Sequence, residues 1–159
     1  MSTLAVWRFH TSHGAERSGL ALQELPHSER AVIHDAARVS WALGSQRPTT
    51  RLMPELARDE GLGEAFWGVL FGVIFFSPLL GAAVGSAPSG PSGSMAHVGI
   101  DDTFVNRIRD SVTPGTSALL VIGSDAMVDH VQDVLRVGPS DDVLTTRLQE
   151  GSLREVFVG

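Results

Sequence analysis

With 159 residues, the chain has the size of one domain with a hydrophobic core of its own. Its 12 Arg and 18 acidic residues give a net charge of −6, which argues against nucleic acid as the main partner. There is no cysteine, which excludes disulfides, thiol catalysis and thiolate metal sites. The first residues lack a basic stretch followed by an apolar one, so a cytoplasmic location is the default expectation.

The N-terminal third predicts a strand, a helix and two further strands. Leu4–Phe9 is a short apolar run rich in strand formers, and Ala15–Leu25 has apolar residues near helical spacing before a proline. Ala31–Trp41 favours a second strand, although its alanines leave a helix open. Pro48–Met53 contains β-branched threonines and suits a third strand that pairs back as a hairpin.

The dominant feature is an uncharged apolar segment, residues 65–87. As a helix it would reach roughly 34 Å, slightly more than the ~30 Å hydrocarbon layer of a bilayer. Two G-x-x-x-G pairs, Gly68/Gly72 and Gly81/Gly85, would clear a helical face for the close approach of another backbone. Pro78 predicts a kink or a break. Two interpretations are open: one kinked span, or a helical hairpin that turns at Pro78.

The C-terminal part has regular patterning. After a Gly/Pro/Ser-rich linker at residues 87–94, Asp101 and Asp102 suit the start of a helix. Ala118–Ile122 is a continuous apolar run, which predicts a strand buried on both faces. A further helix and a strand at Val143–Leu148 follow, and the last residues, 152–157, suit a short helix or an extended tail.

The two ends of the chain thus repeat a strand–helix–strand pattern. Two such units in one small sheet predict an α+β fold, a ferredoxin-like sandwich with an inserted hydrophobic, glycine-zipper helical hairpin. Residues 1–60 and 96–159 would form one discontinuous domain, and residues 61–95 would be the inserted hairpin and linker.

Several short motifs resemble one bacterial family of unknown function whose members are described as predicted membrane proteins. The motifs are a strand that ends in W-[RK]-F, an H-D-A-A segment, the glycine-punctuated apolar core and a G-I-D-D…P-G-[ST]-S-A-L block, here residues 7–9, 34–37, 66–85 and 99–119. The resemblance spans nearly the whole chain and implies a membrane protein but no activity. Pro88 and Pro91 depart from the family pattern, in which a helix continues after the second glycine pair.

The polar candidates for chemistry all have plainer interpretations. His10 and His13 form an H-x-x-H step without an evident third ligand, which favours a solvated loop over a metal site. On a strand, His34 and Asp35 would point to opposite faces, so a buried hydrogen-bonded polar pair is favoured over a catalytic dyad. The pair Asp101–Asp102 suits helix capping, and Asp141–Asp142 a turn. We therefore expect no enzyme activity, and no catalytic, cofactor-binding or metal-binding residue.

The residues expected to carry function lie in the apolar segment, where they would mediate self-association or membrane contact. Trp67 is a candidate interfacial anchor, and the alternative is that the aromatic residues form a helix–helix core in a soluble oligomer. The predicted set is Phe66, Trp67, Gly68, Phe71, Gly72, Phe75, Phe76, Pro78, Gly81 and Gly85.

A sandwich of about 110 residues is expected to be too small to bury this segment, so lipid or other copies must cover it. The first hypothesis is a non-enzymatic, self-assembling scaffold on the cytoplasmic face of the cell membrane, with itself and lipid as partners. The alternative is a soluble cytoplasmic homo-oligomer (ring, shell or filament) whose apolar hairpins share a core. A small-ligand-binding or enzymatic ferredoxin-like domain is the third hypothesis. The biological role and the copy number do not follow from the sequence.

Overall fold

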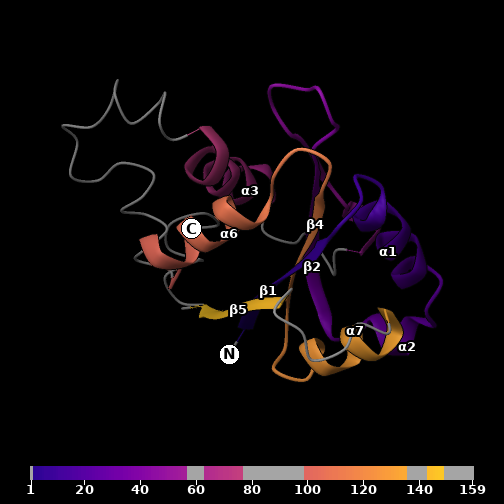
Figure 1. Cartoon of the computed structure of the whole chain (residues 1–159). Coiled ribbons are helices and arrows are strands. Elements are labelled where there is room, and N and C mark those ends of the chain that lie inside the picture. Colours follow the sequence, from indigo (N-terminus) through magenta and orange to yellow (C-terminus); the bar gives the residue numbers. More distant parts are fainter. Residues whose placement is uncertain (1, 57–62, 77–98, 136–142, 149–159) are drawn as a thin grey trace.

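The computed structural model describes residues 2–56, 63–76, 99–135 and 143–148. The helices and strands over these residues, labelled as in Figure 1, are β1 (Ser2–Phe9), α1 (Gly14–Gln23), α2 (His27–Arg30), β2 (Ile33–Ser40), β3 (Thr49–Leu52), η1 (Pro54–Leu56), α3 (Gly63–Phe71), η2 (Gly72–Phe76), α6 (Asp102–Ser111), β4 (Ser117–Gly123), α7 (Met127–Leu135) and β5 (Val143–Leu148). The expectation of a short helix or tail at residues 152–157 lies outside the described residues.

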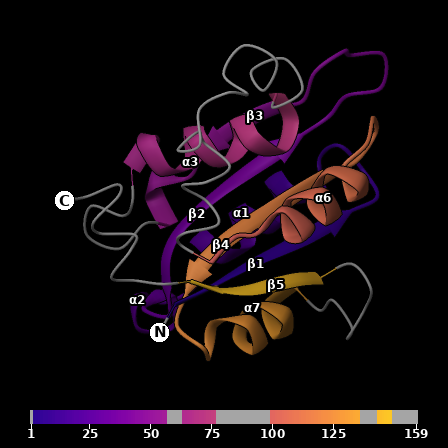
Figure 2. The same ribbon diagram turned by 90° about the vertical axis from the view of Figure 1, so that its left-hand side faces the viewer.

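Both halves of the chain contribute strands to one sheet, with the order β3-β2-β4-β1-β5 and antiparallel neighbours throughout (Figure 2). The α+β class is therefore confirmed. β1 and β2 run in the same direction because both pair with β4, and α1 connects them. β4 and β5 likewise run in one direction, with α7 between them. The predicted hairpin is also present, because β3 pairs back onto β2.

One face of the sheet is covered by α1 and α7, on the right of the sheet in Figure 1. The large side chains of this layer include Trp7 on β1 and Leu119 on β4, both fully buried. This first hydrophobic cluster consists of Ala5, Trp7, Ala15, Leu22, Ile33, Ala36, Met53, Leu56, Leu119, Val121, Met127 and Val131.

The opposite face of the sheet carries a second helical layer, made of α3, η2 and α6 (Figure 1). β4 contributes side chains to both layers, and all seven of its residues are buried, as its continuous apolar run predicts. The second cluster is the larger one and consists of Leu4, Val6, Ala37, Val39, Phe66, Trp67, Leu70, Phe71, Val73, Ile74, Ile100, Phe104, Val105, Ile108, Val112, Ala118, Leu120, Ile122, Leu144 and Leu148.

This second layer buries part of the apolar segment, whereas residues 77–87 of that segment lie outside the described residues. Over Phe66–Ile74, the inward side chains pack on the sheet of the same chain. A ferredoxin-like sandwich has helices on only one face of its sheet. The other face is equally apolar and offers the segment a place to bury.

The start of α6 follows its sequence pattern. Asp101 is the N-cap, and its Oδ1 accepts a hydrogen bond from the backbone N–H of Phe104 at 2.8 Å. Asp102 is exposed in the first turn. The side chain of Asp101 thus satisfies a backbone donor that the helix itself leaves unpaired.

We expect Asp101→Ala to lower the free energy of unfolding by about 1 kcal/mol, because it removes this cap. Asp102→Ala is the matched control, with a change within about 0.5 kcal/mol, since it removes an acidic residue without removing the cap. Urea unfolding of both variants measures the difference. Equal losses would show that the general effect of negative charge at the helix start, and not the capping hydrogen bond, stabilises α6.

Candidate functional site: the apolar helix and its outer face

The candidate site is the continuous helical segment formed by α3 and η2, residues 63–76. Six of its side chains point inward and are at most 5% exposed: Phe66, Trp67, Leu70, Phe71, Val73 and Ile74. At about 1.5–3 kcal/mol for each buried large apolar side chain, this packing is worth on the order of 10 kcal/mol before the entropy of ordering is subtracted. The inner face is thus part of the core of the chain.

A buried carboxylate fixes the helix on the sheet. Asp35 on β2 is 6% exposed, and its Oδ2 accepts a hydrogen bond from the indole Nε1 of Trp67 at 3.1 Å. Its Oδ1 accepts the backbone N–H of Ala36 at 2.8 Å. The register of β2 shifts between Ile33 and Asp35, so Asp35 lies on the same strand face as Ala37 and Val39, below the apolar helix. Asp35 is thus buried and hydrogen-bonded as predicted, whereas His34, the other member of the predicted buried pair, is half-buried.

The place of Trp67 corrects one interpretation of the sequence. An interfacial anchor needs an exposed indole, whereas Trp67 is 1% exposed and its N–H is engaged by Asp35. The aromatic residues instead form a ladder inside the chain. The ring centroids of Phe66 and Trp67 are 5.0 Å apart, those of Trp67 and Phe71 5.9 Å, and those of Phe71 and Phe75 6.4 Å. Trp41 extends the ladder with an edge contact to Phe75 at 6.4 Å.

An arginine of α6 holds the C-terminal end of this segment. Arg109 donates from Nε to the carbonyl of Ile74 at 2.6 Å and from Nη2 to the carbonyl of Val73 at 2.7 Å. Its Nη1 donates to Oδ1 of Asn106 at 2.8 Å, which orients the guanidinium. The planar fork of arginine suits two adjacent carbonyls. The sequence analysis missed this residue.

A signal for this contact is present in the sequence. In an α-helix the carbonyl of Ile74 would accept the N–H of position 78, but Pro78 has none. The carbonyl thus needs a donor from elsewhere, and Arg109 supplies it. The residues of η2 form a π-helical turn, a rare irregularity that is frequent at functional sites.

The outer face of α3, unlike the inner face, has open space above one of its residues. Gly68 is exposed, and a Cβ built on it would meet no atom within 4 Å. Val69, Gly72 and Phe75 are half-buried. The glycine is therefore not required by packing against the described part of the chain. Its small size leaves room over the helix backbone.

The remaining predicted residues of the apolar segment are only partly described. Phe76 is the last residue of η2, and the position of its side chain lies outside the description. Pro78, Gly81 and Gly85 lie outside the described residues, as does the predicted hairpin turn. The structure thus brings together Phe66, Trp67 and Phe71 on the inner face, with the glycines of the first pair turned away from it.

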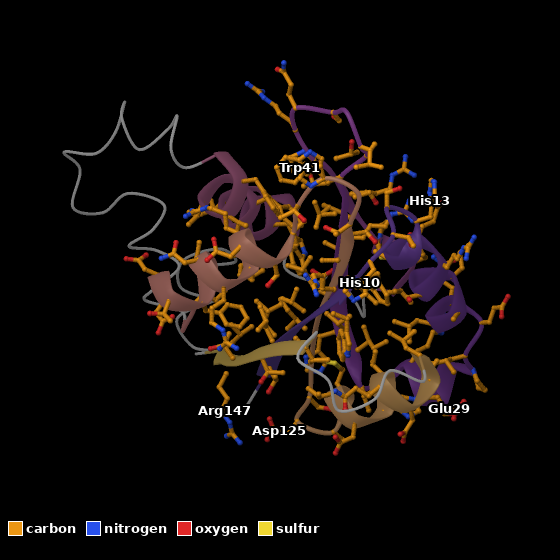
Figure 3. The ribbon with its side chains drawn as sticks, viewed as in Figure 1. His10, His13, Glu29, Trp41, Asp125 and Arg147 are labelled. Atoms are coloured by element: carbon orange, nitrogen blue, oxygen red, sulfur yellow. The ribbon has the colours of Figure 1, made fainter. Side chains whose placement is uncertain are left out.

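The polar candidates are dispersed. His10 is exposed, and His13 precedes α1 with its Nδ1 3.8 Å from Glu16 (Figure 3). His34 is half-buried on β2. Asp141 and Asp142 lie outside the described residues. Over the described residues, no group of three or more His, Asp or Glu side chains is arranged to hold a metal ion.

No helix within the described ranges is both long enough and apolar enough to cross a membrane.

Comparisons with known proteins give a family but no activity. No curated protein and no solved structure matches the chain. A family model described as "Protein of unknown function (DUF1269)" matches residues 61–158, more than half of the chain. The match includes the apolar helix, α6, β4, α7 and β5. The chain therefore belongs to the DUF1269 family of proteins of unknown function.

Proposed function

We propose that the protein is a non-enzymatic, self-assembling structural protein associated with the cytoplasmic face of a membrane, and that copies meet through the outer face of α3. The observation that carries this proposal is Gly68, an exposed glycine with open space above it, on a helix that has no charged residue after Glu64.

Glycine inside a helix lowers stability by about 1 kcal/mol relative to alanine. Packing within the described residues offers no compensation for this at Gly68, because no atom lies within 4 Å of a Cβ built there. A G-x-x-x-G step lets two helix backbones approach closely, and this would offset the loss. A second copy fits the position, since a two-fold axis would bring the same face of each α3 into contact.

The proposed architecture is ferredoxin-like with two additions. The order β2-β4-β1-β5, with α1 and α7 as the two crossovers on one face, supports it. β3 adds an edge strand, and α3, η2 and α6 cover the face that two such units would leave open. The glycine-zipper hairpin would extend this second layer beyond η2.

A soluble homo-oligomer is the second candidate. It is favoured by the burial of the inner face of α3, because Phe66, Leu70 and Ile74 are covered by the sheet of one chain and need no lipid. Both candidates share the outer face of α3 and differ in whether lipid covers the rest of the apolar segment.

We expect Gly68→Leu to abolish or strongly weaken self-association, because leucine fills the space that a second helix would occupy. The open surroundings of Gly68 predict a folded variant. Gly68→Ala is the matched control: it raises helix propensity and adds only one methyl group. Light scattering coupled to size-exclusion chromatography gives the mass of each variant.

The same mass measurement, with and without detergent, separates the two candidates. A discrete particle in detergent-free buffer supports the soluble oligomer, and recovery of the protein only with membranes or detergent supports the scaffold. An unchanged mass for Gly68→Leu would contradict association through α3. So would a wild-type chain that is a monomer under both conditions.

A further inference from the structure

The connection between β2 and β3, residues 41–48, carries the most exposed large hydrophobic side chain identified in the described ranges. Leu43 is 81% exposed, compared with 54% for Leu20 on α1. The connection stands out at the top of Figure 1, beyond the end of the sheet. A single exposed leucine is common on protein surfaces, so its meaning depends on the surroundings.

Backbone hydrogen bonds hold this connection in place. The N–H of Trp41 donates to the carbonyl of Thr116 at 3.0 Å, and the carbonyl of Trp41 accepts the N–H of Gly115 at 2.6 Å. The indole N–H of Trp41 donates to the carbonyl of Ser45 at 2.9 Å. Leu43 also lies close to Gly115, where a built Cβ would be 3.1 Å from Cδ2 of the leucine. Leu43 is therefore presented by an ordered loop.

The charge of this region is opposite to that of the whole chain. From Ala36 to Pro54 the sequence contains three arginines and no acidic residue, in a chain of net charge −6. Arg38 lies 3.8 Å from Glu16 on α1. Arg47 and Arg51 are exposed, one in the connection and one on the edge strand β3. An apolar tip flanked by arginines is complementary to an anionic, partly apolar surface.

The connection also adjoins the end of the apolar helix. Trp41 makes its edge contact with Phe75 in η2. In the sequence, no charged residue follows Phe76 before Asp101. The connection that carries Leu43 thus contacts the C-terminal end of the described apolar helix.

We propose that the β2–β3 connection binds the surface of an anionic lipid bilayer, with Leu43 entering the interface and Arg47 and Arg51 meeting the phosphate groups. This deepens the proposed membrane association and rests on it, while it uses a surface separate from the outer face of α3. The net negative charge of the rest of the chain would orient the molecule with this end toward the membrane.

The test is co-sedimentation of the full chain with vesicles of phosphatidylcholine alone or of equal parts phosphatidylcholine and phosphatidylglycerol. The wild type is expected to bind the anionic vesicles preferentially, and less tightly as salt is raised. Arg47→Glu and Arg51→Glu should each weaken binding at least about fivefold, and Leu43→Ser about tenfold.

The chain offers matched controls. Arg147 occupies the same Thr-Thr-Arg-Leu tetrapeptide on the opposite edge strand β5, and Leu20 is the other exposed leucine. Arg147→Glu and Leu20→Ser should change vesicle binding less than about twofold, because neither residue lies on the proposed surface.

Three results would overturn the proposal: no binding of the wild type to either vesicle, equal losses in the controls, or equal binding to both vesicle types. The mass of each variant without vesicles provides a separate measurement. If the Leu43 and arginine variants reduced particle mass and left vesicle binding unchanged, the surface would bind the acidic part of a second copy instead. The Gly68→Leu measurement, made without vesicles, judges self-association independently.

Discussion

Replacing Trp67 with alanine is expected to lower the free energy of unfolding by about 3–5 kcal/mol, the range for deleting a buried large aromatic side chain. The indole is 1% exposed, stacks on Phe71 and lies edge-on to Phe66. Truncation leaves a cavity between the helix and the sheet and removes the hydrogen bond to Asp35. Urea unfolding, followed by far-UV circular dichroism in detergent-free buffer, measures the loss.

Trp67→Phe separates packing from hydrogen bonding. It keeps an aromatic ring in the ladder but removes the donor to the buried carboxylate of Asp35, so we expect a loss of about 1–3 kcal/mol. Trp41→Phe is the control. It also removes an indole donor, to the carbonyl of Ser45, but at an exposed position where water replaces the lost partner, so less than about 1 kcal/mol should be lost.

The stabilities of the Trp67 and Trp41 variants test whether the apolar helix is buried on the sheet of its own chain. If Trp67→Ala and Trp41→Ala destabilised the detergent-free chain equally and by less than about 1 kcal/mol, the inner face of α3 would not be packed on its own sheet in solution. Lipid or another copy would then have to cover Phe66, Leu70 and Ile74.

Most of the strands and helices follow from local patterns and could be predicted, whereas the short helices α2 and η1 were not. The N-cap Asp101, the hairpin at Thr49–Leu52 and the fully buried strand β4 each depend on residues close together in sequence. The turn residues and the period of apolar side chains are sufficient there, because hydrogen bonds and side-chain direction are set within a few residues.

The sequence analysis did not predict the second helical layer, because the sequence of an apolar helix does not show which apolar surface the helix packs against. The relevant information lay in other parts of the chain. Leu4 and Val6 on β1 face one way, and Ala5 and Trp7 face the other, and all four are buried. Strands that are apolar on both faces require a cover on both faces. With α1 and α7 on one face, the uncharged segment was the available cover for the other.

The polar contacts that position the apolar helix were harder to foresee for a similar reason. Trp67 and Asp35 are 32 residues apart, and Arg109 and Ile74 are 35 apart. Neither pair has a fixed sequence spacing. They meet only because the helix packs across β2 and beside α6. Long-range contacts of this kind depend on topology and not on local propensity.

Replacing Arg109 with alanine is expected to lower the free energy of unfolding by about 2–4 kcal/mol, because two part-buried carbonyls, of Val73 and Ile74, lose their donor. Arg109→Lys keeps the positive charge but not the planar fork, so it should recover only part of this loss. Arg107→Ala is the control, since it removes an exposed arginine from the same helix two residues away.

Amide hydrogen exchange should show which part of the chain is destabilised by Arg109→Ala. If the guanidinium fixes the end of the apolar helix, exchange should accelerate in residues 72–76 and remain unchanged in α1, which lies on the other face of the sheet. Equal acceleration in both regions would mean that the variant is only globally less stable. Slow exchange at 72–76 in Arg109→Ala would contradict a positioning role.

Because Pro78 cannot donate to the carbonyl of Ile74, no backbone N–H at that position replaces the arginine. We therefore expect the exchange rates of residues 72–76 in Arg109→Lys to fall between those of the wild type and those of Arg109→Ala.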